Sequence, residues 1–484
     1  MSSKNNQKNA RRDFLSKSVL GLGALMIVPR YVLGGRGYVA PSDRLNIAGV
    51  GVGGRGKAIL RSAAQLDEKS GETKENIVAL CDVDDQNAAS TYAQYPKANR
   101  YKDFRKMLEA EHKNIDAVMV ATPDHTHAVV AMAAMRLDKH VYVEKPLTHS
   151  IHEARVLTET ARQRGLQTQM GNHGNSGEDI RRICEWIWNG IIGDVTEVHC
   201  WTNRPVWPQG IPRPSEKPPV PGTLDWDLWV GPAPMRPYHP TYVPFGWRGW
   251  WDFGTGALGD MACHIIDPAF KALKLGYPTS VEASTPSVYK APWSPDLNND
   301  SAPAASLIHF NFPSRDKMPA VQLTWYDGNL RPPRPIELGA DEPFGDWDGG
   351  VLFVGEKGKI SCGCYGTKPT LLPTNRMKDF KEPAPMIARV KGNHQTSWVE
   401  ACKGGPAASS NFNYAGPLTE MILIGNLALR SLNILEKVKN RRGELEDAFT
   451  GRKQLLWDAQ NLRITNFEAA NQFIKREYRE GWAL

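Results

Sequence analysis

Segment 45–56 constrains the fold of this chain more than any other part of the sequence. Apolar residues up to Val50 lead into the run Gly-Val-Gly-Gly-Arg-Gly, and residues 57–64 behind it are typical of a helix. Such a turn lets a pyrophosphate approach backbone N–H groups at a helix N-terminus, where the helix dipole favours negative charge. We therefore predict a dinucleotide-binding turn. The pattern G-x-G-x-x-G fits Gly51, Gly53 and Gly56, which is the preferred register because it leaves the strand intact, and a second register uses Gly49, Gly51 and Gly54.

A second strand can complete such a site. Apolar residues 77–81 lead into Asp82, and we interpret the polar stretch 67–74 before them as a loop insertion. A carboxylate at this strand end can bind the adenosine ribose hydroxyls and repel a 2′-phosphate, which favours NAD over NADP without deciding between them. The alternative is the glycine turn of an ordinary α/β protein, with Asp82 as a helix cap.

The N-terminus has the pattern of an export signal. Arg11 and Arg12 open the sequence Arg-Arg-Asp-Phe-Leu, typical of twin-arginine export, and an apolar run follows at 19–28. That run is shorter than a membrane span and has the length of a signal h-region. We assign residues 1–42 to a signal and linker and expect a periplasmic protein. No clean A-x-A cleavage site follows, so an uncleaved signal that anchors the chain in the membrane stays open, as does a disordered basic tail.

The charge of the chain argues against a nucleic-acid partner. Residues 1–40 carry seven basic residues and one acidic residue, a net charge of +6, whereas the whole chain carries +7. The remainder is therefore almost neutral and shows no basic stripe with interleaved aromatic residues. The seven cysteines are scattered and give no sign of a disulfide framework.

Two regions of different character follow the signal. Residues 43–170 alternate strands and helices, which predicts a doubly wound parallel sheet of the Rossmann type. Residues 171–400 hold strand-like segments with little helix between them, which predicts an α+β domain with an open, mostly antiparallel sheet. The expected elements of the first region are helices at 101–108, 126–137 and 151–164 and strands at 115–122 and 140–144; the expected strands of the second are 195–202, 280–289, 305–312, 320–326 and 350–354.

Segment 204–250 interrupts the second region with an unusual composition. Twelve of the 35 prolines lie within residues 204–244, and seven of the fifteen tryptophans lie within residues 201–251. We expect an ordered, irregular loop that covers the site, because this proline density is incompatible with helices and central strands. Its indoles either stack on sugar rings or pack the loop down. Residues 401–484 are expected to be helices that pack back on both domains, and the helices expected from about residue 394 onwards are 398–402, 419–435, 452–464 and 466–479.

Two groups of residues are candidates for chemistry. The first is Glu144-Lys145-Pro146, at the carboxyl end of a predicted parallel strand, where ligands of open α/β sheets bind. Lys145 there can stabilise an alkoxide that forms on a substrate carbon, and a cis Lys145–Pro146 bond would direct the ammonium group. The alternative for this tripeptide alone is a surface lysine.

The second group is Asp260 with His264, which share one face of a helix expected to begin near Gly259. An imidazole held by a carboxylate keeps one tautomer and can move a proton near neutral pH. The alternatives are a helix cap with a core histidine, or a metal site with His125 or His127. The spacing of His125 and His127 is not that of a helical zinc site, so we assign no metal ligand.

Taken together, these motifs resemble the Gfo/Idh/MocA oxidoreductases from about residue 45 to the C-terminus, and most closely the twin-arginine-exported bacterial members. The resemblance implies a nicotinamide-binding Rossmann domain followed by an open mixed sheet that carries the substrate. It further implies that Lys145, Asp260 and His264 form the catalytic group. The motifs are Gly51-Val52-Gly53-Gly54-Arg55-Gly56, residues 121–127 (Ala-Thr-Pro-Asp-His-Thr-His), Glu144-Lys145-Pro146, residues 256–260 with His264 and Asp267, Trp457-Asp458 and the tail 478–482.

The same resemblance supplies the remaining site assignments. We expect a tightly bound nicotinamide cofactor and a homo-oligomer. The expected cofactor-binding residues are Gly51, Gly53, Gly54, Gly56, Asp82, Thr122, Pro123, His127 and Glu144, and the expected substrate-binding residues are Lys145, Trp250, Asp260 and His264.

The resulting hypothesis is NAD(P)-dependent oxidation of a secondary hydroxyl on a sugar, glycoside or cyclitol. His264 would take the hydroxyl proton, Lys145 would stabilise the alkoxide and Asp260 would orient the group. Free NAD is scarce outside the cytoplasm, which motivates an alternative: redox-neutral glycoside cleavage by oxidation, elimination and reduction with a retained cofactor. A third possibility is a non-catalytic sugar-binding protein. The sequence leaves the sugar and its reacting carbon open.

Overall fold

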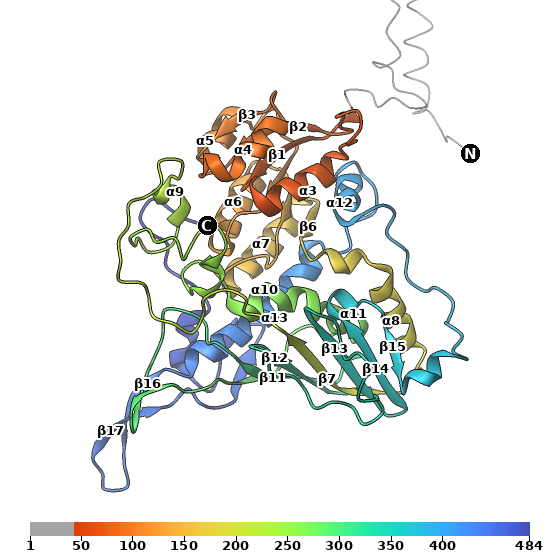
Figure 1. Ribbon diagram of the computed structural model, residues 1–484, viewed down its shortest axis with the longest axis vertical. Coiled ribbons are helices and arrows are strands. Elements are labelled where there is room, and N and C mark those ends of the chain that lie inside the picture. Colours follow the sequence, from red (N-terminus) through yellow and green to blue (C-terminus); the bar gives the residue numbers. More distant parts are fainter. Residues whose placement is uncertain (1–42) are drawn as a thin grey trace, which may run out of the picture. The chain divides into compact units, whose positions relative to one another are not determined.

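Six parallel strands form the first sheet of the computed structural model, which describes residues 43–484 (Figure 1). Their order is β3-β2-β1-β4-β5-β6 within the unit Leu45–Leu484, so the strand order reverses beside β1. The predicted doubly wound parallel sheet is confirmed, while the predicted export signal lies outside the described residues. The strands are β1 Asn46–Val50, β2 Asn76–Cys81, β3 Asn99–Tyr101, β4 Ala117–Val120, β5 His140–Val143 and β6 Thr168–Met170.

Helices cover both faces of this sheet, because successive residues of each strand point to opposite sides. In β4, Val118 and Val120 join the apolar cluster under α5, α6 and α7, whereas Ala117 and Met119 join the cluster under α3, α4 and α12. This alternation explains why the strands read as continuous apolar runs. The helices are α3 Gly54–Ala64, α4 Asp85–Gln94, α5 Phe104–Glu111, α6 Asp124–Arg136, α7 Ile151–Arg164 and α12 His394–Cys402.

The helix expected at 101–108 is partly wrong. Tyr101 ends β3, and α5 begins only at Phe104, after Asp103 accepts a hydrogen bond from the N–H of Arg105 as the N-cap. Neither β3 nor α4 was predicted. Strand β3 has three residues, all at least partly exposed, and α4 buries only three side chains, so neither gives a clear hydrophobic period.

A nine-stranded sheet forms the second half, in the order β15-β14-β13-β7-β12-β11-β8-β18-β19. Only β7 and β12 pair in parallel; the other neighbours are antiparallel, which confirms the predicted mostly antiparallel sheet. The strands are β7 Val195–Thr202, β8 Ser280–Ser284, β11 Leu307–Phe312, β12 Val321–Tyr326, β13 Gly349–Gly355, β14 Gly358–Gly363, β15 Thr370–Leu372, β18 Leu455–Asp458 and β19 Arg463–Ile464.

Helices join the second sheet to the first (Figure 1). Helix α13 packs against α7 on one side and β8 on the other, and it also contacts α10. One apolar cluster therefore runs from β4 and β5 through these helices to β7, β11 and β12. The helices are α8 Glu178–Trp188, α10 Gly256–Ile265, α11 Asp267–Ala272 and α13 Phe412–Ser431.

The C-terminal part is less helical than predicted. The expected helix 452–464 is wrong, because Leu455 and Trp457 are buried while Leu456 between them is exposed, a period of two that belongs to strands β18 and β19. Of the expected helix 466–479, only the short 3₁₀ helix η6 (Glu468–Phe473) forms. A hairpin of β16 Leu435–Lys439 and β17 Leu445–Phe449 was not predicted.

The proline- and tryptophan-rich segment is irregular, with only a short helix α9 (Trp226–Val230) and a 3₁₀ turn η3 (Gly246–Gly249). Its aromatic residues form a cluster of their own, in which the rings of Trp226 and Trp229 stack at 4.8 Å. Packing therefore accounts for much of this aromatic content.

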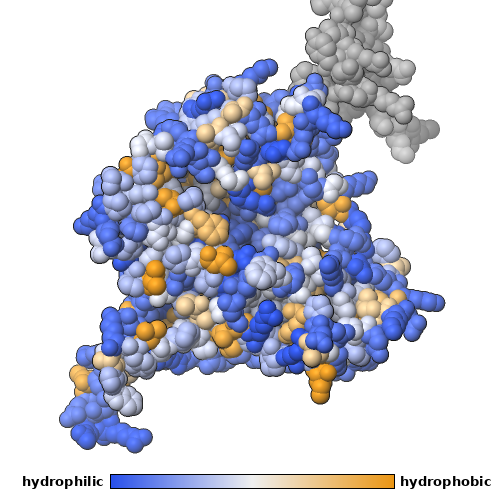
Figure 2. Space-filling view, in the orientation of Figure 1, coloured by the Kyte–Doolittle hydropathy of each residue, from blue (hydrophilic) through white to orange (hydrophobic). Residues whose placement is uncertain are grey.

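All seven cysteines lie among the described residues and are free. Within residues 43–484, no helix has the length and apolar character needed to cross a membrane. Figure 2 shows a largely hydrophilic face on which apolar residues gather only in small groups. That face therefore offers no large apolar patch for a partner.

Candidate active site

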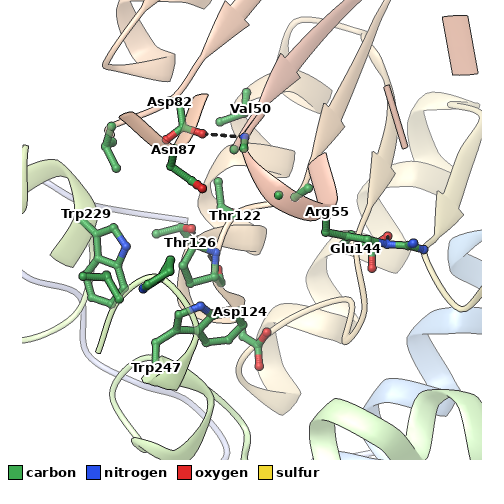
Figure 3. Close-up of a pocket in the computed structure, with 18 of the residues that line it drawn as sticks. Val50, Arg55, Asp82, Asn87, Thr122, Asp124, Thr126, Glu144, Trp229 and Trp247 are labelled. Carbon is green, nitrogen blue, oxygen red and sulfur yellow. Dashed lines mark hydrogen bonds and ion pairs between the residues drawn. The ribbon is translucent and has the colours of Figure 1, made fainter. Parts of the chain in front are cut away.

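A cavity of about 620 Å³ opens at the carboxyl ends of the parallel strands, beside the point where the strand order reverses. Ligands of open α/β sheets bind at this place. Its lining includes the glycine turn with Asp82, the β5 end with Lys145, and α10 with Asp260 and His264. The proline- and tryptophan-rich segment contributes a further wall, which includes Trp229 and Trp247 (Figure 3).

The glycine turn is built on contacts that exclude side chains. Gly51 has a φ of +75° and donates its N–H to the carbonyl of Cys81 at 2.9 Å. A Cβ on Gly56 would lie 1.9 Å from the carbonyl oxygen of Gly51, so the helix can approach the turn only with glycine there. Strand β1 runs intact to Val50, as the preferred register assumes, whereas helix α3 begins at Gly54, three residues before the helical stretch expected from the sequence.

The N-terminus of α3 is open to an anion. Gly53 occupies the N-cap position without a side-chain cap, and the first turn holds no acidic residue within the described chain. The first N–H groups of a helix need partners from outside the helix. Gly54 and Arg55, the first two residues of α3, both line the cavity, so donors of the first turn lie at it. The arrangement fits a pyrophosphate group.

Asp82 holds the glycine turn in place. Its Oδ2 accepts hydrogen bonds from the N–H groups of Val52 at 2.8 Å and Gly53 at 3.0 Å, and its Oδ1 accepts one from Asp84 at 3.0 Å. Figure 3 shows Asp82 at the edge of the cavity. Burial raises the pKa of Asp82, although these three bonds lower it. A carboxylate has about four acceptor positions, so one remains for a ribose hydroxyl. Asp84, and not Asp82, caps α4.

Lys145 and Asp260 meet across the cavity from separate segments. The Nζ of Lys145 donates to Asp260 Oδ1 at 2.6 Å and to the backbone carbonyl of Asp260 at 2.9 Å. Arg248 Nε lies 3.2 Å from the same carboxylate oxygen. Burial opposes ionisation of Asp260, but Lys145 and Arg248 outweigh it and lower its pKa. Lys145 is therefore an ammonium held by a buried carboxylate and not a surface lysine; its bond to Pro146 is cis.

The predicted pairing of Asp260 with His264 is wrong. Helix α10 places the two residues one turn apart, but among the described residues the Asp260 carboxylate bonds to Lys145 and Arg248 and not to the imidazole. Nδ1 of His264 is buried and has no hydrogen-bond partner in the described chain. The carboxylate turns away because two cations compete for it.

His264 instead packs among aromatic rings at the cavity wall. Its ring centroid lies 5.2 Å from that of His173 and 4.8 Å from that of Tyr365. Burial, and then the positive charge of Lys145, lowers the pKa of His264 well below its usual range. The imidazole is therefore neutral at neutral pH, and one of its ring nitrogens is a hydrogen-bond acceptor.

Asp124 is a further buried carboxyl group in the cavity, and sequence reasoning did not single it out. Thr255 Oγ1 donates to its Oδ2 at 2.7 Å. Burial raises the pKa of Asp124 to about 7, against the lowering effect of Lys145 and Arg248. The sequence could have indicated Asp124, because it directly follows Thr122 and Pro123 in the motif of residues 121–127.

The other expected cofactor-binding residues divide into two groups. Thr122, Pro123 and Glu144 line the cavity, and Glu144 pairs with Arg55 at 3.3 Å (Figure 3). Gly56 and His127 do not line it. Gly56 packs against the backbone of Gly51 and so supports the glycine turn. The two ring nitrogens of buried His127 lie 2.8 Å from the backbone carbonyl oxygens of Thr122 and Pro146. His127 therefore braces the strand ends and does not face a ligand.

Trp250 is not a substrate contact. Its side chain is completely buried in the aromatic cluster of the covering segment and is absent from the cavity lining of the described chain. Trp247 and Arg248, two consecutive residues of the 3₁₀ turn η3, reach the cavity instead. Composition alone does not distinguish these positions.

Several further lining residues were missed. Arg55 lies inside the glycine run, and His173 follows the carboxyl end of β6, so both had a positional signal. Arg204, Arg248 and Tyr365 had none, since they come from irregular segments of the second domain. In the part of the chain that the structure describes, no group of three histidine, cysteine or acidic side chains is arranged to hold a metal ion.

Two family models match the chain. The first is described as an oxidoreductase family with an NAD-binding Rossmann fold and covers residues 45–172. The second is described as the C-terminal alpha/beta domain of an oxidoreductase family and covers residues 191–290. The boundaries agree with the parallel sheet and the beginning of the mixed sheet.

The curated relatives are distant and match over part of their length. A glycosyl hydrolase family 109 protein of Shewanella pealeana is 27% identical over 191 residues, which is 37% of this chain and 40% of that protein. A levoglucosan dehydrogenase of Pseudarthrobacter phenanthrenivorans is 24% identical over 191 residues, or 39% of this chain and 40% of the relative. The chain therefore spans about two fifths of the length of these relatives.

Solved structures share the fold over most of the chain. The WlbA dehydrogenase of Bordetella pertussis, in complex with NADH and UDP-GlcNAcA, superposes with a TM-score of 0.54. It is 17% identical, and the match covers 79% of this chain and 95% of that one. At this identity the likeness concerns the fold alone.

Proposed function

We propose, because this chain belongs to the Gfo/Idh/MocA family of NAD-binding oxidoreductases, that it oxidises a secondary hydroxyl of a sugar, glycoside or cyclitol with NAD. The observation that carries the proposal is the convergence of Lys145 and His264 on the cavity that also contains the open N-terminus of α3. A hydride acceptor and proton-handling groups are thereby brought to one space, which is the arrangement that alcohol oxidation needs.

The residues of the cavity fit a nicotinamide dinucleotide. The backbone N–H groups of Gly54 and Arg55 at the start of α3 would hold the pyrophosphate, because that of Gly53 already bonds to Asp82, and the remaining acceptor position of Asp82 would take a ribose hydroxyl. Thr122 and Glu144 line the path from there to Lys145. When bound, the nicotinamide supplies a hydride acceptor. The buried carboxylate of Asp82 supports NAD over NADP, since it would repel a 2′-phosphate.

Lys145 is suited to stabilise negative charge on the substrate oxygen. Two of its three N–H donors are used by Asp260, so the third can donate to a substrate hydroxyl. Fixed donors in a partly buried site stabilise a developing alkoxide more than water does. Asp260 thus orients Lys145, and His264, which lines the same cavity, is the group proposed to take the hydroxyl proton.

A second candidate function is redox-neutral cleavage of a glycoside, which the name of the Shewanella relative favours. Oxidation of a hydroxyl to a ketone would acidify the neighbouring C–H and allow elimination of the aglycone. Addition of water to the resulting double bond and return of the hydride to the ketone would release the sugar with no net change in the cofactor. Both functions use the same Lys145 and His264. They differ in the products released.

One experiment separates the two functions. The purified chain is denatured to identify any released nucleotide by mass spectrometry, and the intact chain is incubated with a panel of sugars and aryl glycosides. The dehydrogenase predicts an oxidised sugar with stoichiometric NADH; cleavage predicts a free aglycone without net NADH. A chain that neither contains nor binds NAD and changes no sugar contradicts both.

The cofactor preference is tested by replacing Asp82 with asparagine. An amide cannot accept all the bonds that Asp82 makes to Val52, Gly53 and Asp84, and it carries no charge. We expect NAD to bind roughly tenfold more weakly and the preference for NAD over NADP to fall by a similar factor. Binding is measured by cofactor titration.

Asp84→Asn is the matched control. Asp84 accepts hydrogen bonds from the N–H groups of Gln86 and Asn87 as the N-cap of α4, a role that asparagine fills equally well. Its NAD affinity should stay within about twofold of the unmodified chain, because a preserved cap changes stability little. An unchanged NADP preference in Asp82→Asn would contradict the role given to Asp82.

The location and assembly are part of the same proposal. The twin-arginine pattern supports export to the periplasm with the cofactor already bound and retained, with or without cleavage of the signal. We expect a homo-oligomer. Cell fractionation of the full chain, with Arg11 and Arg12 both replaced by lysine as the comparison, tests the export route, and light scattering tests the assembly.

A further inference from the structure

A second cavity of about 720 Å³ lies in the other half of the fold. It is bounded by the end of β8 with the loop 285–288, the loop 295–304, the end of α13 and the 3₁₀ helix η6. It shares no lining residue with the cavity of the candidate active site within the described chain. Its size is that of a small-molecule site.

Arg430, in the last turn of α13, is the unusual residue of this cavity. Its guanidinium carbon lies 4.2 Å from the ring centroid of Phe473 and 5.7 Å from that of Trp251. Within residues 43–484 it forms no recorded hydrogen bond or ion pair. Burial alone lowers its pKa to about 10, so the group stays charged at neutral pH.

No carboxylate of the described cavity wall balances this charge. Asp296 pairs with Lys290 at 2.8 Å, and Glu282 is exposed on β8. Arg430 is partly buried and keeps contact with solvent, so an anion that binds it gains a charge-assisted pair in a partly shielded place. Stacking on two rings leaves the planar fork of the guanidinium free to donate two parallel hydrogen bonds. Arg430 is therefore a partly buried cation of the cavity wall, without an ion pair in the described chain, and is suited to bind an oxyanion.

The wall beside it is polar and rigid. Asn433 donates to the side chain of Asn299 at 2.9 Å and to the backbone of Asn298, and Asn298 donates to Ser301 at 2.8 Å. Ser284 and Ser287 add hydroxyl groups at another edge. Such a wall suits a ligand with several hydroxyl groups. The negative charge that pairs with Arg430 would come from a single carboxylate on that ligand.

We propose that this cavity binds a polyhydroxylated carboxylate of the hexuronate class, with the carboxylate on the guanidinium of Arg430. The site is separate from the nicotinamide site. Trp251 lines this cavity, whereas Trp247 and Arg248 line the cavity of the candidate active site. Fully buried Trp250 lies between them in the chain, and the backbone of residues 249–251 is hydrogen-bonded to residues 300–302.

The test is calorimetric titration of the full-length chain with D-glucuronate, D-glucose and inorganic phosphate. We expect glucuronate to bind at least about tenfold more tightly than glucose, because a charge-assisted pair is lost in the neutral sugar. Arg430→Gln should weaken glucuronate binding at least about tenfold and leave NAD binding unchanged. The matched control is Arg452→Gln, an exposed arginine at the rim, which should weaken it less than about threefold.

Equal glucuronate binding by the unmodified chain and by Arg430→Gln would overturn the proposal, and so would phosphate binding as tight as glucuronate binding. A second readout needs no variant. Phenylglyoxal labelling of Arg430, followed by peptide mass spectrometry, should be slowed by glucuronate and not by glucose. Absence of labelling, or no protection, would also overturn it. These assays detect no turnover, so they stand if the proposed oxidoreductase function fails.

Discussion

Replacing Lys145 by alanine is expected to lower turnover by roughly 10²–10³-fold, the usual effect of removing a donor that stabilises a developing oxyanion. The variant loses the N–H that faces the substrate, and Asp260 keeps only Arg248 as a cation. NAD affinity should stay within about threefold, since the glycine turn and Asp82 make no recorded hydrogen bond or ion pair with Lys145 in the described structure. Steady-state kinetics with a sugar identified from the panel, together with cofactor titration, measure both quantities.

Lys102→Ala is the control for this result. Lys102 also lines the cavity, but it pairs with Asp85 at 3.0 Å near the glycine turn, away from Asp260. Removing an exposed pair costs little, so its turnover should stay within about threefold. If Lys145→Ala retained turnover within about tenfold of the unmodified chain, Lys145 would not be the group that stabilises the alkoxide.

Gly56→Ala is expected to damage cofactor binding as strongly as Lys145→Ala damages turnover. The added methyl group would lie 1.9 Å from the Gly51 carbonyl oxygen and 2.9 Å from its carbonyl carbon, both of them backbone atoms. The turn or the start of α3 must therefore shift, at a cost of roughly 1–3 kcal/mol in the free energy of unfolding. NAD affinity should fall about 10²-fold, because the donors at the α3 N-terminus lose their alignment.

Gly222→Ala separates this effect from that of any added methyl group. A Cβ on Gly222 meets no atom of the described chain within 4 Å, and its φ is not left-handed. Its thermal stability and NAD affinity should match those of the unmodified chain. Normal NAD binding by a folded Gly56→Ala variant would show that the turn does not hold the pyrophosphate.

The sequence was most informative where one local rule decides the structure. Helix α7 spans Ile151–Arg164, as expected, because Ser150 and Glu153 form a capping box at its start and Gly165 ends it in a left-handed conformation. The same rules failed for 452–464, where two strands form because β8 offers a partner edge. The free edge of β8 exists only in the folded protein, so no local sequence pattern predicts the pairing.

The candidate site shows the same division. The position of Lys145 followed from one rule, that ligands meet the carboxyl ends of parallel strands. Its contact with Asp260 joins residues that are 115 positions apart in the chain. Arg248, which donates to the same carboxylate of Asp260, comes from an irregular segment. Helical spacing placed Asp260 beside His264, but the choice of partner depended on cations that arrive from elsewhere in the fold.

A crystal structure of the chain with bound NAD tests the central claim most directly. The account predicts a pyrophosphate on the N-terminus of α3 and a nicotinamide ring whose C4 faces the space between Lys145 Nζ and the His264 ring. One hydroxyl-bearing carbon should fit there at a reacting distance of about 3–3.5 Å. A nicotinamide ring that points away from both side chains, or NAD bound outside this cavity, would contradict it.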